Sequence, residues 1–293
     1  LRRFVLNMEY SGIKGSISAE ELVCHVKGLI YSLPFEIKKR GKEKAFEYLQ
    51  SVLDESQQIR EKLGEMEEFR LKQCFEEHIH PITNCSTACN YFLDQPRGYP
   101  GDSGAMEIIW KTRTHKLPFR SGSNIIGKCI NDFTLSSSNC KSNELRVYRL
   151  KKYLLGLTSK TIASIGAGSV IEVEEAIKEN PALHFEIHLF DQDKEACTAS
   201  KNKLSNTKLN VLYHQGNVLK TILGLKDTTF DFIYSAGLFD YLTLKASKKL
   251  IKKLWAHLKP GGRLLITNAH PGNPTRMWME YVGNWYLVYK TRR

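Results

Sequence analysis

The sequence has no apolar run approaching the roughly 20 residues that span a bilayer. Its first residues, Leu1-Arg2-Arg3-Phe4, also lack the apolar core of a signal peptide, so we expect no targeting segment there. The seven cysteines are odd in number and scattered, which argues against a regular disulfide framework and suits a reducing compartment. We therefore predict a cytoplasmic protein with no transmembrane segment.

The sequence also has few residues arranged to hold a metal ion. Cys85 and Cys89 are spaced C-x3-C, and His78 and His80 lie close to them. This spacing fits no compact four-ligand zinc pattern well. We predict buried or idle thiols and no metal.

Acidic residues are fewer than basic ones, with 31 Asp and Glu against 43 Lys and Arg and a formal charge of +12. Dispersed positive charge steers acidic partners, which include nucleic acid, an acidic carrier protein and a carboxylate substrate. The densest run, Lys245 to Lys259, has apolar residues at spacings of three and four. We predict an amphipathic helix whose lysines face water, with Leu250, Leu254 and Trp255 on its apolar side.

The pattern changes near residue 158. Residues 1–157 are largely helical in pattern, with Ser16 or Ser18 as a helix start, and we expect them to form an N-terminal helical cap with a lid loop. Within this part we expect loop-like stretches at 81–100 and 121–143. We also expect a helix at 143–155 with a buried side formed by Leu145, Tyr148, Leu150 and Tyr153.

Residues 158–293 alternate strands with helices, which is typical of βαβ units and a parallel sheet. The predicted strands lie near 161–165, 185–190, 209–213, 230–235 and 262–267. The predicted helices between them lie near 171–179, 194–203 and 242–258, and we expect Pro260-Gly261-Gly262 to end the last helix. The predicted class is therefore α/β: a Rossmann-like, mostly parallel sheet with helices on both faces.

A strand, a glycine turn and a helix follow one another over residues 161–172. Gly166 and Gly168 let the chain turn sharply and let a ligand approach the backbone. Such an elbow lies at the carboxyl end of a buried parallel strand, where open α/β sheets bind ligands. A dinucleotide would require a third glycine, but position 171 is Ile171, and Glu172 in the first helical turn would repel a pyrophosphate.

Polar or small residues follow the next three predicted strands as well. Asp191, about 20 residues beyond the elbow, is placed to accept both hydroxyls of a ribose, although a surface Asp that starts a turn is the alternative. Around Asn217, a polar side chain and the backbone lie where they can reach an adenine edge. Residues 235–241 form a small-residue turn at the crevice of the sheet.

In this order and spacing, residues 159–268 resemble the class I S-adenosylmethionine-dependent methyltransferases, including the segment K-P-G-G-R-L-L-I at 259–266. The resemblance implies an enzyme that uses S-adenosyl-L-methionine as its cofactor. The implied cofactor-binding residues are Tyr99, Asp102, Gly166, Ala167, Gly168, Glu172, Asp191, Gln192, Gly216, Asn217, Val218, Ser235, Ala236 and Gly237.

Three further segments resemble one bacterial group, the methyltransferases related to the synthase of 3-hydroxy fatty acid methyl ester signals, of the hydroxypalmitate type. They are R-G-Y-P-G-D at 97–102, Y-S-A-G-L-F-D-Y-L at 234–242, and the closing N-P-T-R…M-E-Y…W-Y-L-V-Y. The resemblance implies methyl transfer to the carboxylate of an acyl substrate, free or carrier-bound, to give a methyl ester. The sequence departs from the group at Ser169, where Pro is usual, at Asn284, often Asp, and at Lys290, often Arg.

A carboxylate acceptor is already ionised at neutral pH and needs no general base. Catalysis then depends on alignment and on the exclusion of water. The candidate catalytic residues are Tyr99, Arg146 and His270.

Arg97, Arg146 and Arg149 are candidates to hold the acceptor, because a guanidinium grips a carboxylate with two hydrogen bonds; ordinary solvated arginines are the alternative for the last two. We expect Tyr99 and Asp102 in a lid over the cofactor, where Asp102 pairs with the cofactor ammonium or an arginine. His270 is either a base for a hydroxyl acceptor or a residue at the entry to a helix.

Other functions stay open at this point: methyl transfer to RNA, DNA or another small molecule, and a non-catalytic cofactor-binding protein. Against nucleic acid, the fourth strand ends in Ser-Ala-Gly-Leu and not in Asn/Asp-Pro-Pro-aromatic, and there is no Pro-Cys nucleophile. Class I methyltransferases complete their sheet with an antiparallel hairpin. Residues 285–289 can supply one of its strands, which leaves the other either absent or outside this sequence.

Overall fold

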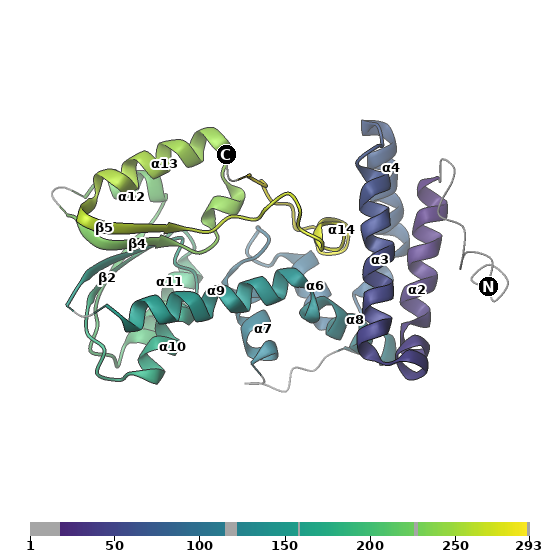
Figure 1. Cartoon of the computed structure of the whole chain (residues 1–293), viewed down its shortest axis with the longest axis horizontal. Helices are drawn as coiled ribbons and strands as arrows, with labels where there is room; N and C mark the ends of the chain where they lie inside the picture. The colour runs from purple at the N-terminus through teal and green to yellow at the C-terminus, as the bar shows by residue number, and fades with distance from the viewer. Residues whose placement is uncertain (1–17, 115–121, 158, 226–227, 292–293) are drawn as a thin grey trace. The chain divides into compact units, whose positions relative to one another are not determined.

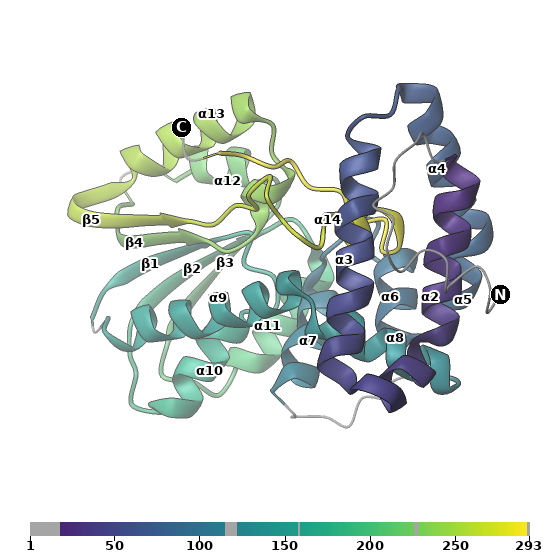
Figure 2. The same cartoon turned by 45° about the vertical axis from the view of Figure 1, so that its right-hand side comes forward.

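The computed structural model describes residues 18–114, 122–157, 159–225 and 228–291 (Figures 1 and 2). The chain forms two compact units, each assembled from separated segments. The helical unit comprises residues up to 101, 112–140 and 274–286, and the sheet unit comprises 102–111, 141–273 and 287–293. The predicted domain boundary falls at residue 158, outside the described residues, and stays a prediction. Ser16 and the first residues of the chain lie outside them as well.

The described helices of the helical unit surround one apolar core that includes Ile30, Leu53 and Phe75. These helices are α2 (Ala19–Arg40), α3 (Lys42–Arg60), α4 (Glu65–His78), α5 (His80–Thr83), α6 (Thr87–Asp94), α8 (Ile125–Ser136) and α14 (Arg276–Tyr281).

The predicted loops at 81–100 and 121–143 were wrong over α5, α6 and α8, because the polar residues in these stretches cap helices. Ser86 accepts a hydrogen bond from the Cys89 N–H at the start of α6, and Asn124 accepts one from the Gly127 N–H at the start of α8.

Ser18 begins α2 with a capping box, as its position in the sequence predicted. Its hydroxyl accepts from the Glu21 N–H, and the Glu21 carboxylate accepts from the Ser18 N–H.

Replacing Ser18 by alanine is expected to destabilise the protein by about 1 kcal/mol, because one orphan N–H of the helix loses its partner. Chemical denaturation measures the change. Ser51→Ala, a control on the exposed side of α3, is expected to leave the free energy of unfolding within roughly 0.5 kcal/mol. Equal losses in both variants would contradict the role of the cap.

The segment around α14 belongs to the helical unit through buried contacts. Trp278 donates from Nε1 to the Thr134 hydroxyl at 3.1 Å. Glu280, which is 2 % exposed, pairs with Arg60 of α3 and with Arg276. Packing therefore accounts for much of the R-M-W-M-E-Y sequence.

The sheet unit contains a five-stranded, all-parallel sheet in the order β3-β2-β1-β4-β5. Its strands are β1 (Thr161–Ile165), β2 (Glu186–Asp191), β3 (Asn210–Gln215), β4 (Phe230–Ser235) and β5 (Leu258–Ile266). The α/β, Rossmann-like class predicted from the sequence is confirmed. Parallel strands covered on both faces are apolar along their whole length, which is why the sequence pattern located β1 and β4 correctly.

Helices cover both faces of this sheet (Figure 2). On one face, α9 (Ser138–Leu155), α10 (Ile171–Glu179) and α11 (Lys194–Leu204) pack through Leu154, Val173 and Leu204. On the other face, α12 (Val218–Leu223) and α13 (Leu244–Ala256) pack through Val218 and Leu250. The unit also contains most of α7 (Ser103–Arg113) and the 3-10 turn η1 (Leu238–Tyr241).

Two predicted buried faces were wrong in part. On α9, Leu150 is buried as predicted, but Leu145, Tyr148 and Tyr153 are exposed, because Leu150 and Leu154 form the stripe that meets the sheet. On α13, Leu250 and Leu254 are buried, but Trp255 is 68 % exposed.

Two predictions at the end of the sheet were also wrong. Pro260-Gly261-Gly262 does not end the last helix: α13 ends at Ala256, and these residues lie inside edge strand β5, whose pairing with β4 shifts between Phe230 and Phe232. Residues 285–289 form no strand, and within the described residues the sheet has only its five parallel strands.

All seven cysteines are free thiols. In the described part of the chain, no three His, Cys, Asp or Glu side chains gather as a metal site. No helix described here is both long and apolar enough to cross a membrane.

Candidate active site

The carboxyl ends of the parallel strands meet at one edge of the sheet. The direction in which successive strands are added to the sheet reverses at β1. Strands β2 and β3 lie on one side of β1, and strands β4 and β5 lie on the other. Open α/β sheets bind ligands at such a reversal, so the turns after β1 and β4 are the natural centre of a site.

The turn after β1 is built from two glycines in the left-handed region, Gly166 with φ 67° and Gly168 with φ 57°. The N–H groups of Gly166 and Ala167 donate to the Phe190 carbonyl at 2.8 and 3.1 Å, which fixes the elbow against β2. A Cβ on Gly166 would lie 3.0 Å from the Cβ of Leu238, so a side chain here would collide with the turn after β4.

Val170, at the start of α10, also has positive φ, at 48°. This conformation is strained for a β-branched residue, and backbone strain of this kind is concentrated at functional sites. The positive φ could not be predicted from the sequence, because valine rarely adopts the left-handed backbone conformation.

Asp191, at the end of β2, lies beside the elbow. One carboxylate oxygen accepts from the Gly168 N–H at 2.7 Å, and the other accepts from the Asp193 N–H at 2.9 Å. Burial raises the pKa of Asp191. Each carboxylate oxygen can accept a second hydrogen bond, so the group keeps acceptor capacity for a ligand. Gln192 is exposed next to it.

The turn after β3 is tied to the same edge, because the Gly216 N–H donates to the Asp191 carbonyl at 2.9 Å. The Asn217 side chain accepts from the Lys220 N–H and caps α12, a helix that the sequence pattern missed. The Asn217 side chain is exposed and Val218 is buried.

Ser235 ends β4, and its hydroxyl donates to the Ile165 carbonyl at 2.8 Å. The side chain is fully buried and joins β4 to the end of β1. Ala236 and Gly237 follow it as half-buried residues at the sheet edge.

Glu172 points into the sheet unit. Its carboxylate accepts from the Tyr234 hydroxyl at 2.7 Å, and the side chain is buried. Burial raises the pKa of Glu172, although the nearby charge of Arg146 opposes the rise.

Replacing Glu172 by glutamine keeps the acceptor for Tyr234 and removes the ionisable group. Below the ordinary pKa of 4.5, this carboxyl is neutral in both the folded and the unfolded wild type, so the variants are expected to be equally stable. As the pH rises from 4.5 through the raised pKa, ionisation favours the unfolded wild type, and the wild type is expected to fall below E172Q in stability. Thermal melting over a pH series measures the difference. An E172Q variant less stable than the wild type at neutral pH would contradict this account.

The first turn of α7 lies against the elbow. Asp102 is buried and accepts from the Ala105 N–H at 2.8 Å, which confirms the predicted helix cap. A Cβ placed on Gly168 would lie 3.9 Å from the Cβ of Ser103. The end of the R-G-Y-P-G-D segment therefore borders the glycine turn.

A lysine that the sequence reasoning missed holds α7 in this position. Lys203 of α11 pairs with Glu107 of α7, donates to the Ser169 carbonyl in the elbow at 3.0 Å, and pairs with Glu174 of α10 at 3.0 Å. Glu107 precedes Lys203 by 96 residues, so no local spacing could have indicated the contact.

The two arginines of α9 lie in different environments. Arg149 is exposed, whereas the guanidinium of Arg146 lies 3.6 Å from the position of a Cβ on Gly237. Arg146 donates to the Asn143 side chain and to the Met106 sulfur. Burial lowers the pKa of Arg146, although the carboxylates of Asp240 and Glu172 oppose the change.

Asp240 is a second residue that sequence reasoning missed. It is buried, and one of its carboxylate oxygens accepts from the Ala269 N–H at 2.6 Å. Lys290, at the end of the chain, donates to the Phe239 carbonyl at 2.7 Å and to the Asn268 side chain at 2.9 Å. The terminal segment thus packs on the turns after β4 and β5 without forming a strand.

Three further predicted site residues are His270, Arg97 and Tyr99. His270 is exposed after β5, and its Nδ1 accepts from the Gly272 N–H at 3.1 Å. Arg97 and Tyr99 belong to the helical unit. Their predicted roles stay predictions.

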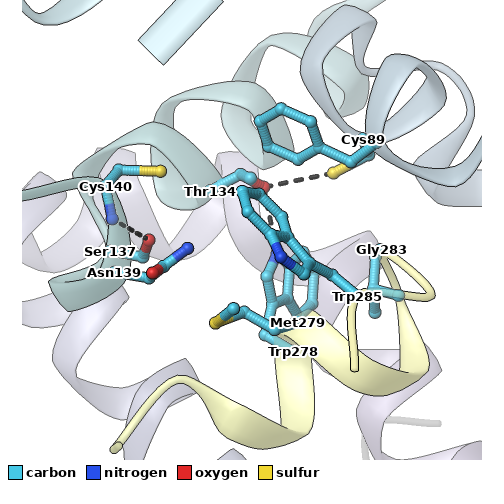
Figure 3. Close-up of a pocket in the computed structure, with 11 residues that line it drawn as sticks. Cys89, Thr134, Ser137, Asn139, Cys140, Trp278, Met279, Gly283 and Trp285 are labelled. Atoms are coloured by element: carbon cyan, nitrogen blue, oxygen red, sulfur yellow. Dashed lines mark hydrogen bonds between the residues drawn. The ribbon is translucent and has the colours of Figure 1, made fainter. Parts of the chain in front are cut away.

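A pocket in the helical unit is chemically different (Figure 3). Its lining includes Phe92, Trp278 and Trp285. The Thr134 hydroxyl in this pocket accepts a hydrogen bond from the Trp278 Nε1 and lies 3.1 Å from the Cys89 sulfur. Burial raises the pKa of Cys89 to about 11, so this thiol is protonated at neutral pH. The pocket offers apolar contact and no reactive group.

Residues 162–262 match the protein family described as a methyltransferase domain. The matched range contains the elbow, Asp191, Gly216 and the turn from Ser235 to Gly237.

Parts of several solved structures are similar to part of the chain. The glycopeptide N-methyltransferase MtfA has 16 % identity and a TM-score of 0.35 over 43 % of this chain and 55 % of its own. TehB from Haemophilus influenzae has 16 % identity and a TM-score of 0.36 over 42 % and 41 %.

A methyltransferase from Thiobacillus denitrificans, in complex with S-adenosyl-L-homocysteine, has 15 % identity and a TM-score of 0.33 over 42 % and 47 %. The chain spans about half the length of these three structures. No curated protein sequence matches the chain.

Proposed function

We propose that this chain transfers the methyl group of S-adenosylmethionine to the carboxylate of a 3-hydroxy fatty acid and so forms a methyl ester. The observation that carries the proposal is the match of residues 162–262 to a methyltransferase domain, because that range joins the glycine elbow to Asp191. The seven free thiols support a reducing compartment, the cytoplasm.

The residues at the sheet edge fit this cofactor. The glycine elbow leaves the backbone open to close approach, and Asp191 supplies carboxylate oxygens for the two ribose hydroxyls. Asn217 and Val218 border the adenine, and Ser235 to Gly237 form the floor of the crevice. The buried carboxylate of Glu172 disfavours the phosphates of a dinucleotide and is compatible with a cofactor that carries none.

S-adenosylmethionine supplies an electrophilic methyl group on a positively charged sulfur. The task of the chain is to hold the acceptor oxygen in line with that group and to exclude water. Arg146 holds the acceptor carboxylate, because its guanidinium lies beside Gly237 at the sheet edge. Asp102 and Tyr99 belong to the lid in this proposal, with Lys203 positioning α7 over the elbow. His270 is exposed and becomes a base only for a hydroxyl acceptor.

The choice of a 3-hydroxy fatty acid is supported by the resemblance of three segments to the bacterial methyl ester synthases. These segments lie at 97–102, at 234–242 and from Asn273 to Tyr289. A carboxylate also agrees with the excess of positive charge.

The test is to incubate the full chain with methyl-labelled S-adenosylmethionine and a series of 3-hydroxy fatty acids, free or attached to an acyl carrier protein, with RNA as the comparison acceptor. We expect label in the organic extract and a methyl ester by mass spectrometry. Label found only in RNA would reject the lipid acceptor. Cofactor binding without transfer to any acceptor would indicate a non-catalytic protein.

A further inference from the structure

Helix α13 carries apolar side chains on its outer side as well as on its inner side. Leu250 and Leu254 are buried against the sheet. Leu244, Ile251 and Trp255 are 59 %, 37 % and 68 % exposed. At 3.6 residues per turn, the spacings of seven and four place these three side chains within roughly 40° of one another. We refer to Leu244, Ile251 and Trp255 as the outer stripe.

The polar side of the same helix is entirely basic. Lys245, Lys248, Lys249 and Lys252 are exposed. The sequence has no Asp or Glu between Asp240 and Glu280. Among the described residues, no carboxylate lies within ion-pair distance of these four lysines. Helical geometry places the lysines along one side of the outer stripe and the sheet on its other side.

The exposed lysines and the outer stripe together favour one kind of negatively charged partner over others. Lysines alone would suit RNA or an acidic protein equally well. An exposed tryptophan aligned with leucine and isoleucine adds a surface that enters the headgroup region of a bilayer, where amphipathic helices rich in Lys and Trp lie. Anionic lipids attract basic residues near their surface.

We propose that the outer face of α13 binds an anionic lipid surface, with the outer stripe in the headgroup region and the lysines on the lipid phosphates. The inference does not depend on methyl transfer. A protein bound to a lipid surface would encounter fatty acids in the bilayer into which they partition.

Trp255 is a built-in probe for this contact. The other tryptophans, Trp110, Trp278 and Trp285, are at most 5 % exposed. With the full chain and vesicles of phosphatidylcholine containing phosphatidylglycerol, we expect co-sedimentation, a blue shift of tryptophan emission, and quenching by brominated acyl chains. With phosphatidylcholine alone, or at high salt, we expect binding to be largely lost.

Two triple variants separate the helix from net charge. K248A/K249A/K252A removes three charges from α13 and is expected to weaken partition onto anionic vesicles roughly 100-fold. K38A/K39A/K44A removes the same charge from exposed positions of α2 and α3 and is expected to change it less than about 3-fold.

A third variant, W255S, keeps the charge, and it is expected to lose the quenching and to bind more weakly. Equal losses in the two triple variants would overturn the proposal. Absence of wild-type binding to anionic vesicles at low salt would also overturn it, even if the protein bound RNA or an acidic protein instead. Tryptophan emission that brominated lipid does not quench would overturn it as well.

Discussion

Replacing Arg146 by methionine is expected to lower kcat/KM for methyl transfer to a 3-hydroxy fatty acid by roughly 100- to 1,000-fold. Truncating one partner of a buried, hydrogen-bonded charge pair costs about 2–5 kcal/mol, and each 1.4 kcal/mol is a factor of ten. Here the lost partner is the guanidinium beside Gly237, and the acceptor carboxylate would have no cation in its place. The dissociation constant of S-adenosylmethionine is expected to change little, because the proposal assigns cofactor binding to other residues.

Steady-state kinetics and a separate cofactor titration measure the two effects. Arg149→Met is the matched control: it lies on the same helix, three residues further on, and is exposed. It is expected to retain near wild-type kinetics. Arg146→Lys keeps the charge without the two-pronged geometry and is expected to recover part of the rate. Equal losses at Arg146 and Arg149, or an Arg146 variant with full activity, would refute the assignment.

Replacing Asp191 by alanine is expected to weaken the binding of S-adenosylmethionine by roughly 10- to 100-fold. A hydrogen bond to a charged group contributes about 1.5–3 kcal/mol, and the carboxylate would accept from the ribose hydroxyls. The same carboxylate accepts from the Gly168 N–H, so its loss also loosens the glycine elbow. Because burial raises the pKa of Asp191, we expect wild-type affinity to begin falling, as the pH is lowered, at a pH above the ordinary aspartate value of 3.8.

Asp193 gives the control for this variant. It carries the same charge two residues further along and caps α11, accepting from the Glu195 N–H at 2.8 Å. Asp193→Ala is expected to lower thermal stability through the lost cap and to leave cofactor affinity within about 3-fold. Isothermal titration with S-adenosylmethionine compares the two variants. Equal affinity losses would assign the effect to general loss of negative charge.

The strands at the centre of the sheet could be predicted well from the sequence. β1, β4 and α10 have the predicted bounds, because buried parallel strands are continuously apolar and the glycine elbow marks the turn between strand and helix. The positions of Asp191 and Gly168 at one edge follow from the same parallel order.

Features that depend on tertiary contacts could not be predicted. Lys203 meets the elbow and α7 through partners distant in the sequence. Pro260 suggested the end of a helix, but an edge strand with a register shift accommodates it. Trp255 fits the apolar spacing of α13 and yet faces outward, since Leu250 and Leu254 already fill the contact with the sheet.

The central claim is that the edge of the sheet around Gly166, Gly168 and Asp191 binds S-adenosylmethionine. Isothermal titration of the full chain with S-adenosyl-L-homocysteine, the unreactive product, tests it most directly. We predict saturable binding at one site per chain, abolished in a Gly166→Val variant whose side chain would collide with Leu238, provided that this variant melts cooperatively. Absence of binding by the wild type at millimolar ligand, or undiminished binding by a folded Gly166→Val protein, would contradict the claim.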